Sequence, residues 1–398
     1  MDGSTRSRER GCDMRLALNA WFWDQPTVGS GQYLRHLAGH LPLAAPTYAY
    51  YLVGPADALP HPGPQAQGTT LTWHPASPLF GKERPRLRKL AFEQLVFPRA
   101  CRALKADVAH VPHWGPPLFS PCPLVVTIHD LIPLLLPAYR SKWTMRWYVR
   151  LVGLAARRAA AVIAVSRATA QDVARHLHIP PERIRVIYEA APPDCRPVAD
   201  PAVLAIVRRK YALPDRFFLY IGGFDVRKNL ETLLAAYAAL PRTEAFPALV
   251  VAGRLPETDS PFMPDPRAQA ARLGLADRVH FAGAIDEADK PALYSLAMAL
   301  FYPSRYEGFG LPPLEAMACG CPVAASDATS LPEVVGEGGI LVGPEDEGGW
   351  AEAMRRLADE AERKRWQERG LAQAARFSWL CAAQETVEVY ARVAGRRL

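Results

Sequence analysis

The sequence contains no run of about eighteen uncharged apolar residues, which is the length that a membrane-spanning helix needs. The first thirteen residues lack the apolar core of a secretion signal, and we expect them to form a flexible tail. Neither glycine turn, at 29–31 or 222–223, has the G-x-G-x-x-G spacing of a dinucleotide site, which argues against a simple dehydrogenase. The seven cysteines are scattered and odd in number, so we expect reduced thiols rather than a disulfide framework.

Positive charge is concentrated in two stretches of the first half. The chain of 398 residues carries a net charge of +7, and its 49% apolar content can fill two cores of ordinary size. Residues 82–105 and 140–158 each carry a net charge of +6, so the remaining residues sum to −5. An anionic membrane surface, a phosphorylated substrate or a nucleic acid would each be compatible with this surplus.

Strand patterns alternate with helical patterns along the whole chain. Apolar, β-branched runs that predict buried strands occur in the first half at 14–20, 48–54, 107–112 and 123–131. A proline-rich linker follows at 191–201, and the same alternation resumes beyond it. This order predicts two α/β domains, each with a parallel sheet covered by helices on both faces, and ligands beyond the carboxyl ends of the strands.

The most informative stretch is 302–322, which reads YPSRYEGFGLPPLEAMACGCP. Prolines at its first helical positions and a glycine past its end predict a helix from about Pro312 to Cys319, after a strand over 299–302. Glu307 lies in the loop and Glu315 near the first turn of the helix. Carboxylates that accept hydroxyl hydrogen bonds, beside amides at a helix N-terminus, suit a sugar joined to a diphosphate. The alternative is a surface loop with two solvated glutamates.

A second motif lies in RFFLYIGGFDVRKNLETLL, which predicts a strand, a glycine turn and a helix. Gly222 and Gly223 form the turn, and Arg227 and Lys228 stand at the entry to the helix. Cations beside backbone amides form a diphosphate site, although a solvated Arg-Lys pair would give the same pattern.

In the first half, Gly29, Ser30 and Gly31 precede a predicted helix and could present amides to a phosphate. His129 stands at the carboxyl end of the strand over 123–131, where a histidine is either structural or directed at a ligand. His110 and His113 lie near another strand end and are weaker candidates for an acceptor site.

The stretch 302–322 resembles the signature of retaining glycosyltransferases of family 4, with two glutamates, a Gly-Phe-Gly loop and a Pro-Val after the helix. The resemblance extends from about Met14 to the C-terminus and is strong after Arg216. It implies the GT-B fold, with two Rossmann-like domains across a cleft: an acceptor domain over 14–195 and a nucleotide-sugar domain over 196–375. A terminal helix over 376–398 would cross back to the first domain.

The resemblance implies an enzyme that moves a hexose from a nucleotide diphosphate sugar with retention of configuration. GDP-mannose or UDP-glucose would be the donor substrate, and a glycan or lipid-linked saccharide the acceptor. No other cofactor and no metal is expected, and the sequence has no Asp-x-Asp metal signature. The protein would be cytoplasmic, with peripheral contact at the inner face of the cell membrane as an option, and no nucleic acid partner is expected.

The resemblance also assigns residues. Arg227 and Lys228 would stabilise the leaving diphosphate, Glu315 would hold the ribose, and His129 would reach the sugar from the other domain once the cleft closes. Glu307 and the amides of Gly308, Phe309, Gly310 and Leu311 would orient the sugar. The other expected donor contacts are Gly29, Ser30, Gly31, Gly222, Gly223, Arg254, Gly283, Ala284 and Ile285. Many family members have arginine where this chain has Gly223, so we expect Arg227 to replace it.

Three questions stay open at this level. A probable helix over 139–160 aligns Lys142, Arg146 and Arg150 beside Trp143 and Trp147, which fits either a membrane-interface helix or a packed helix with a basic edge. The chain could instead be another GT-B enzyme, such as a nucleotide-sugar epimerase or a phosphorylase. It could also be a non-catalytic subunit that binds glycans or membranes.

Overall fold

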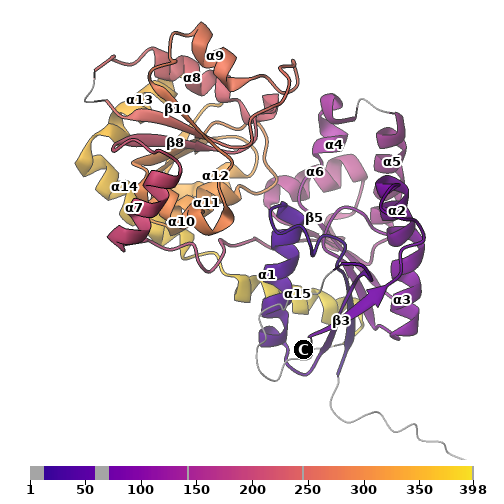
Figure 1. Cartoon of the computed structure of the whole chain (residues 1–398). Helices are drawn as coiled ribbons and strands as arrows, with labels where there is room; N and C mark the ends of the chain where they lie inside the picture. The colour runs from indigo at the N-terminus through magenta and orange to yellow at the C-terminus, as the bar shows by residue number, and fades with distance from the viewer. Residues whose placement is uncertain (1–12, 59–70, 141–142, 244–245, 397–398) are drawn as a thin grey trace, which may run out of the picture. The chain divides into compact units, whose positions relative to one another are not determined.

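The structure is a computed structural model that describes residues 13–58, 71–140, 143–243 and 246–396 (Figure 1). The tail expected over 1–13 lies outside the described residues, apart from Asp13. The chain divides into two compact units: unit 1 is Met1–Tyr188 with Trp379–Leu398, and unit 2 is Glu189–Ser378. The domain boundaries expected from sequence stood at 195/196 and 375/376.

The described residues of unit 1 contain one parallel sheet of seven strands, in the order β3-β2-β1-β4-β5-β6-β7. The strands are β1 (Arg15–Asn19), β2 (Ala49–Pro55), β3 (Leu71–Ala76), β4 (Val108–Val111), β5 (Leu124–Ile128), β6 (Ala161–Ala164) and β7 (Ile184–Val186). The central strands β4, β5 and β6 are buried along their whole length, as their apolar runs predict. The strand order reverses between β1 and β4, and ligands bind parallel sheets at such a switch point.

Helices cover both faces of this sheet. They are α1 (Gly29–Ala44), α2 (Pro85–Ala91), α3 (Phe97–Ala103), α4 (Ile132–Leu135), α5 (Trp143–Arg157), α6 (Arg167–Leu177) and α15 (Trp379–Val393), with short turns η1 (Phe92–Val96), η2 (Pro137–Arg140) and η3 (Pro181–Arg183). Side chains from η1, α3, α5 and α6 share one core on one face, and Figure 1 shows α1 and α15 on the opposite side.

The terminal helix α15 returns to unit 1, which confirms the expected crossing. The ring of Trp379 lies 5.8 Å from that of Tyr33 on α1. Near the other end of α15, Tyr390 Oη lies 2.6 Å from Nδ1 of His110 on β4. None of the helices in the described residues combines the length and the apolar character needed to cross a bilayer.

The described residues of unit 2 form a second parallel sheet of six strands, in the order β10-β9-β8-β11-β12-β13. The strands are β8 (Phe217–Ile221), β9 (Ala248–Ala252), β10 (Val279–Gly283), β11 (Ala299–Tyr302), β12 (Val323–Ser326) and β13 (Ile340–Val342). Its strand order reverses between β8 and β11. The two sheets confirm the α/β, Rossmann-like architecture expected for both halves.

The helices of unit 2 are α7 (Pro201–Lys210), α8 (Leu230–Ala238), α9 (Pro266–Arg272), α10 (Lys290–Leu296), α11 (Leu311–Ala318), α12 (Leu331–Val335), α13 (Glu347–Ala358) and α14 (Glu360–Ala374), with turns η4 (Val226–Lys228), η5 (Glu287–Asp289) and η6 (Gly336–Gly338). Phe218 on β8, Leu233 on α8 and Trp350 on α13 meet in the core on one face. This core supports β8 and β11, whose carboxyl ends carry the candidate site.

One expected helix has different bounds. The helix predicted over 139–160 consists of η2 and, separately, α5, which ends at Arg157. Residues 141–142, and with them Lys142, lie outside the described residues. Pro137 and the following residues form a 3₁₀ turn because proline fixes its own φ and removes an amide donor.

Candidate active site

The candidate site of unit 2 lies at the carboxyl ends of β8 and β11, the neighbouring strands between which the strand order reverses. The turn η4 follows β8, and its cap Asp225 accepts a hydrogen bond from the amide of Arg227 at 3.2 Å. Asn229 takes a left-handed backbone conformation and donates its side-chain amide to the carbonyls of Pro303 (3.1 Å) and Pro344 (2.7 Å). The turn that carries Arg227 and Lys228 is therefore attached to the loop after β11.

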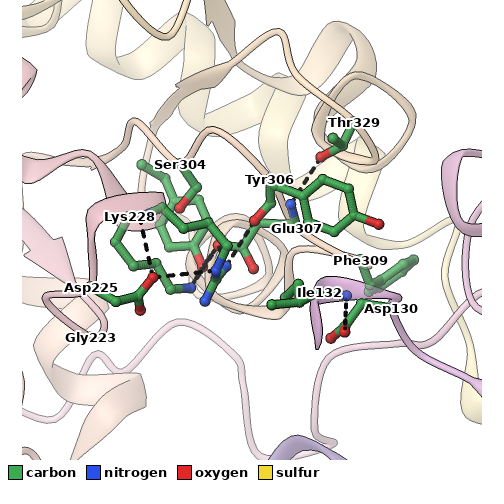
Figure 2. Close-up of polar contacts among 12 residues, drawn as sticks. Asp130, Ile132, Gly223, Asp225, Lys228, Ser304, Tyr306, Glu307, Phe309 and Thr329 are labelled. Carbon is green, nitrogen blue, oxygen red and sulfur yellow. Dashed lines mark hydrogen bonds and ion pairs between the residues drawn. The ribbon is translucent and has the colours of Figure 1, made fainter. Parts of the chain in front are cut away.

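Two cations meet one carboxylate at this point (Figure 2). Lys228 Nζ lies 2.6 Å from Glu307 Oε1, and Arg227 Nη1 lies 2.9 Å from the same oxygen. Tyr302, the last residue of β11, donates its hydroxyl to Glu307 Oε1 at 3.0 Å and accepts from Lys228 at 2.8 Å. The three charged side chains are only 11–13% exposed. Sequence reasoning missed Tyr302, although its place at the end of the strand was available.

The electrostatics of this cluster fix the charge state of Glu307. Burial alone would raise the pKa of Glu307, but the charges of Lys228 and Arg227 outweigh burial and lower this pKa to about 2. Glu307 is therefore ionised at neutral pH and acts only as a hydrogen-bond acceptor. Arg227 Nε also lies 3.4 Å from Asp225, so the two cations and two carboxylates balance in charge.

The loop around Glu307 is fixed by its backbone. Thr329 Oγ1 accepts a hydrogen bond from the amide of Glu307 at 2.9 Å. Ser330 donates its hydroxyl to the carbonyls of Glu307 (3.0 Å) and Phe309 (2.6 Å). Gly310, the N-cap of α11, has a φ of +116°. A residue with a side chain would be strained in this backbone conformation. The loop is therefore held in one geometry by the segment before α12.

The helix α11 begins at Leu311, one residue before the predicted start. Pro312 and Pro313 follow, and proline has no amide hydrogen, so Leu311 alone among the first three helical residues has a backbone donor. Any anion at this helix end would thus depend on the amides of Gly308 to Leu311, as the resemblance implied, because the next two helical residues have no amide hydrogen.

Glu315 is the fifth residue of α11, directly after its first turn, and is only 2% exposed. It accepts a hydrogen bond from the hydroxyl of Tyr294 at 2.8 Å. Burial raises the pKa of Glu315, and this effect is partly offset by Lys290 and Tyr294. Its environment therefore differs from that of Glu307: one carboxylate is held ionised between cations, and burial disfavours ionisation of the other.

Three glycines stand in a row at the ends of β8, β9 and β10. Gly222 donates its amide to Ala252 (3.1 Å), and Gly253 donates to Gly283 (2.7 Å). A Cβ at Gly253 would lie 2.1 Å from the carbonyl oxygen of Gly222, so the close approach requires glycine there. Of the other expected donor contacts, Gly223, Arg254 and Ala284 are exposed and Ile285 is half-buried.

In unit 1, the expected turn at Gly29, Ser30 and Gly31 forms the start of α1 itself. The amide of Gly31 donates to the carbonyl of Val28 at 2.8 Å, so this amide bonds within the backbone. A phosphate contact at this helix start stays a prediction. A Cβ at Gly31 would lie 2.1 Å from the carbonyl oxygen of Gln25, so backbone packing requires this glycine.

His129 follows β5 and is half-buried. Its Nε2 donates to the carbonyl of Pro112 at 3.1 Å, and its ring meets Tyr33 edge-on at 4.8 Å. The adjoining Asp130 accepts from the amide of Ile132 at 2.9 Å and so starts α4 (Figure 2). These contacts fix the imidazole at the carboxyl edge of the sheet.

The two weaker histidine candidates belong to the interior. His110 is bonded to Tyr390 and Thr127, and burial lowers its pKa to about 3. His113 lies 3.2 Å from the buried Glu93, and burial lowers its pKa to about 4. Both are neutral at physiological pH and inaccessible, so their proposed role at an acceptor site is wrong.

Two protein-family models match this chain, one in each half. Residues 206–373 match the family model "Glycosyl transferases group 1", and residues 28–194 match "Glycosyltransferase Family 4". The chain is 34% identical to O-antigen chain mannosyltransferase B of Escherichia coli over 75% of its own length and 78% of that protein. The chain belongs to the group 1/family 4 glycosyltransferases.

This glycosyltransferase is also similar to a longer mannosyltransferase and to two solved structures. It is 33% identical to the serotype-specific mannosyltransferase WbdA of Escherichia coli over 69% of its length, but it spans only 34% of WbdA. The sucrose-phosphate synthase of Thermosynechococcus elongatus superposes with a TM-score of 0.71 at 25% identity, over 95% of this chain and 98% of that one. HepE of Anabaena, solved with UDP-glucose, has a TM-score of 0.71 at 19% identity, over 94% of this chain and 98% of that one. This likeness shows the GT-B fold alone.

In this glycosyltransferase, the structure brings Arg227, Lys228 and Glu307 into one cluster. Glu315 has a separate set of contacts on the same loop and helix, and His129 belongs to unit 1. Among the described residues, no group of three or more His, Cys, Asp or Glu side chains is arranged to hold a metal. The roles assigned to individual residues stay predictions.

Proposed function

We propose that this glycosyltransferase transfers mannose from GDP-mannose, with retention of configuration and without a metal, to a glycan or lipid-linked saccharide. The observation that carries the proposal is the buried pairing of Glu307 with Lys228 and Arg227 at the strand-order switch of unit 2. Mannose is preferred to glucose because the relatives at 33–34% identity are named as O-antigen or serotype-specific mannosyltransferases. The setting would be the synthesis of a surface polysaccharide.

The cations would act on the leaving diphosphate. The Lys228 ammonium has three hydrogens, and its described contacts with Glu307 and Tyr302 use two of them. The third is available to a phosphate oxygen. Preorganised cations in a site of low dielectric constant stabilise the charge that develops on the leaving group. Because Glu307 and Asp225 balance the two cations, the substrate would be attracted mainly by short hydrogen bonds and not by long-range charge.

Glu307 would orient the sugar. With a pKa of about 2, it has no proton to give at neutral pH, so it cannot protonate the leaving diphosphate. Double displacement with retention uses two carboxylates at about 5 Å across the reacting bond. The buried Glu315, held by Tyr294, is not suited to be the second of such a pair. We therefore favour front-side attack, in which the leaving phosphate accepts the proton of the acceptor hydroxyl.

The remaining expected contacts belong to the same proposal. Glu315 would accept the ribose hydroxyls, and His129 would donate to the sugar from unit 1. The amides of Gly308 to Leu311 would also bind the sugar. Gly283 to Ile285 would contact the nucleobase through the main chain.

The test begins with donor binding. The full chain is mixed with GDP-mannose, UDP-glucose, UDP-galactose or GDP alone, and the shift in Tm is measured, because bound ligand stabilises the folded state by mass action. We expect the largest shift with GDP-mannose. Transfer is then measured with a mannose-terminated, lipid-linked oligosaccharide in EDTA, and the anomeric proton of the product is assigned by NMR. Inverted product, a requirement for added magnesium, or isomerised sugar nucleotide without transfer would each contradict the proposal.

Two variants separate the roles of the cations. Lys228→Ala and Arg227→Ala should each raise the KM for GDP-mannose by about tenfold or more, because each removes a charge-assisted hydrogen bond. Arg355→Ala, at an exposed pair with Glu352, is the matched control and should leave KM unchanged. An unchanged KM in Arg227→Ala beside a raised KM in Lys228→Ala would show that Arg227 does not replace the arginine missing at Gly223.

A further inference from the structure

The helix α5 exposes large apolar side chains on one face. Trp143 is 71% exposed, Trp147 is 62% exposed and Leu154 is 54% exposed. Their spacing of four and seven residues places them on one side of the helix. The opposite side packs into unit 1 through residues that include Val149 and Val152. The tryptophans therefore take no part in the core.

The helical stretch α2–η1, next to α5, also exposes apolar side chains. Leu87 and Leu95 are exposed on it. It is joined to α5 because Lys89 Nζ donates to the hydroxyl of Tyr148 at 2.7 Å. Figure 1 shows α2, α3 and α5 together along one side of unit 1. We call this surface the aromatic-basic face, and it comprises Leu87, Leu95, Trp143, Trp147 and Leu154 with the exposed arginines Arg84, Arg86, Arg99, Arg146 and Arg150.

The aromatic-basic face carries basic residues and no acidic one, although the neighbouring Glu83 is exposed and offsets part of their charge. The stretch 140–158, which includes α5, has no acidic residue. Along 82–105 the acids are Glu83 and Glu93, and Glu93 is fully buried against Lys89 and His113. The guanidinium of Arg150 lies 5.6 Å from the ring of Trp147, so cation and aromatic are presented side by side.

We propose that the aromatic-basic face binds the surface of an anionic phospholipid bilayer. Tryptophan prefers the headgroup level, where its ring is apolar and its indole N–H reaches polar groups. Arginines beside it would bind lipid phosphates, and helices with this division of faces lie in the plane of the interface. A second copy of the chain would bring two faces of the same positive charge together, which electrostatic repulsion opposes. This proposal does not depend on the proposed function, since it concerns binding without substrate.

The experiment is co-sedimentation of the full chain with unilamellar vesicles of phosphatidylcholine containing about 30 mol% phosphatidylglycerol. We expect the chain to bind these anionic vesicles and to bind pure phosphatidylcholine vesicles at least about tenfold more weakly. Binding to the anionic vesicles should also weaken at about 0.5 M salt. Trp143→Ala/Trp147→Ala and Arg146→Glu/Arg150→Glu should each lower the partition coefficient by about tenfold or more. Far-UV circular dichroism and Tm should stay unchanged, because these side chains are exposed.

The matched controls lie on α7 of unit 2, which also exposes apolar and basic side chains. Val203→Ala/Ile206→Ala and Arg209→Glu should leave vesicle binding unchanged. Brominated lipids provide a second measurement: they should quench tryptophan fluorescence in the wild type and less in Trp143→Ala/Trp147→Ala. Absence of binding to anionic vesicles, or equal loss in the α7 variants, would overturn the proposal. A dimer that dissociates when the tryptophans are replaced would overturn it in favour of a copy-to-copy interface.

Discussion

Replacement of Glu307 by glutamine would test the buried charge cluster directly. The change keeps the size of the side chain and removes only its negative charge. Lys228 and Arg227 would then lose the partner that lies 2.6 and 2.9 Å away, in a site where the side chains are only 11–13% exposed. Loss of a carboxylate is costly for buried cations, because water does not restore their lost hydration; of the two, Arg227 keeps a second carboxylate, Asp225, at 3.4 Å.

The magnitude follows from the pKa of Glu307. A pKa of about 2, against an ordinary value of 4.5, corresponds to about 3 kcal/mol of stabilisation at neutral pH. Because the folded-state pKa lies below the unfolded one, this stabilisation is complete above about pH 5. It is lost as the pH falls from 4.5 towards 2. The difference between wild type and Glu307→Gln should therefore be largest at pH 7 and smaller by about 1 kcal/mol at pH 4.

The assay is urea denaturation at both pH values, followed by circular dichroism. Glu345→Gln is the matched control, because Glu345 also pairs with an arginine, Arg305, but its side chain is 62% exposed. Exposed pairs contribute about 1 kcal/mol or less, so the control should remain within that margin of the wild type. A loss below about 1 kcal/mol in Glu307→Gln, or equal losses in both variants, would refute the reasoning.

Three further predictions concern positions around the site and the core. Gly310→Ala should cost about 2 kcal/mol in urea denaturation, because φ is +116° and the new Cβ would lie 2.7 Å from Leu331. The pKa of His110 is about 3 in the folded state and has an ordinary value of 6.5, so the unfolded state binds its proton at a higher pH than the folded state does. The free energy of unfolding should therefore decrease as the pH is lowered from about 6.5. In His110→Gln this slope should be shallower by about 1.4 kcal/mol per pH unit in denaturation at pH 6 to 4. Arg305→Ala removes a 2.6 Å hydrogen bond to the carbonyl of Val226, and we expect the donor KM to rise about tenfold with less effect on kcat; an unchanged KM would contradict this.

Much of the fold could be predicted from sequence because its causes are local. Fully apolar runs predicted the buried central strands, and their alternation with helical patterns predicted parallel sheets. Prolines at the first helical positions and a glycine past the end predicted α11 to within one residue. Strand β3 and the stretch α2–η1–α3 were not predicted, because β3 mixes apolar and polar residues and the helical stretch is rich in charge.

The candidate site was predicted as a set of residues but not as an arrangement. Sequence spacing placed Arg227 and Lys228 at one turn and Glu307 at another, and the family resemblance gave each an expected role. It could not show that one carboxylate oxygen accepts from both cations and from Tyr302, so that the cluster is balanced in charge. It also gave no means of telling a buried histidine such as His110 from an accessible one.

The sequence by itself determined the two α/β domains, the strand-end loops and the residues that they carry, because backbone propensities and turn chemistry act over a few residues. Only the tertiary structure decided which of these loops meet. Lys228 and Glu307 are 79 residues apart and come together because β8 and β11 are neighbours in the sheet. Burial at that contact then sets the charge state of Glu307, and burial is a property of the folded chain that no short stretch encodes.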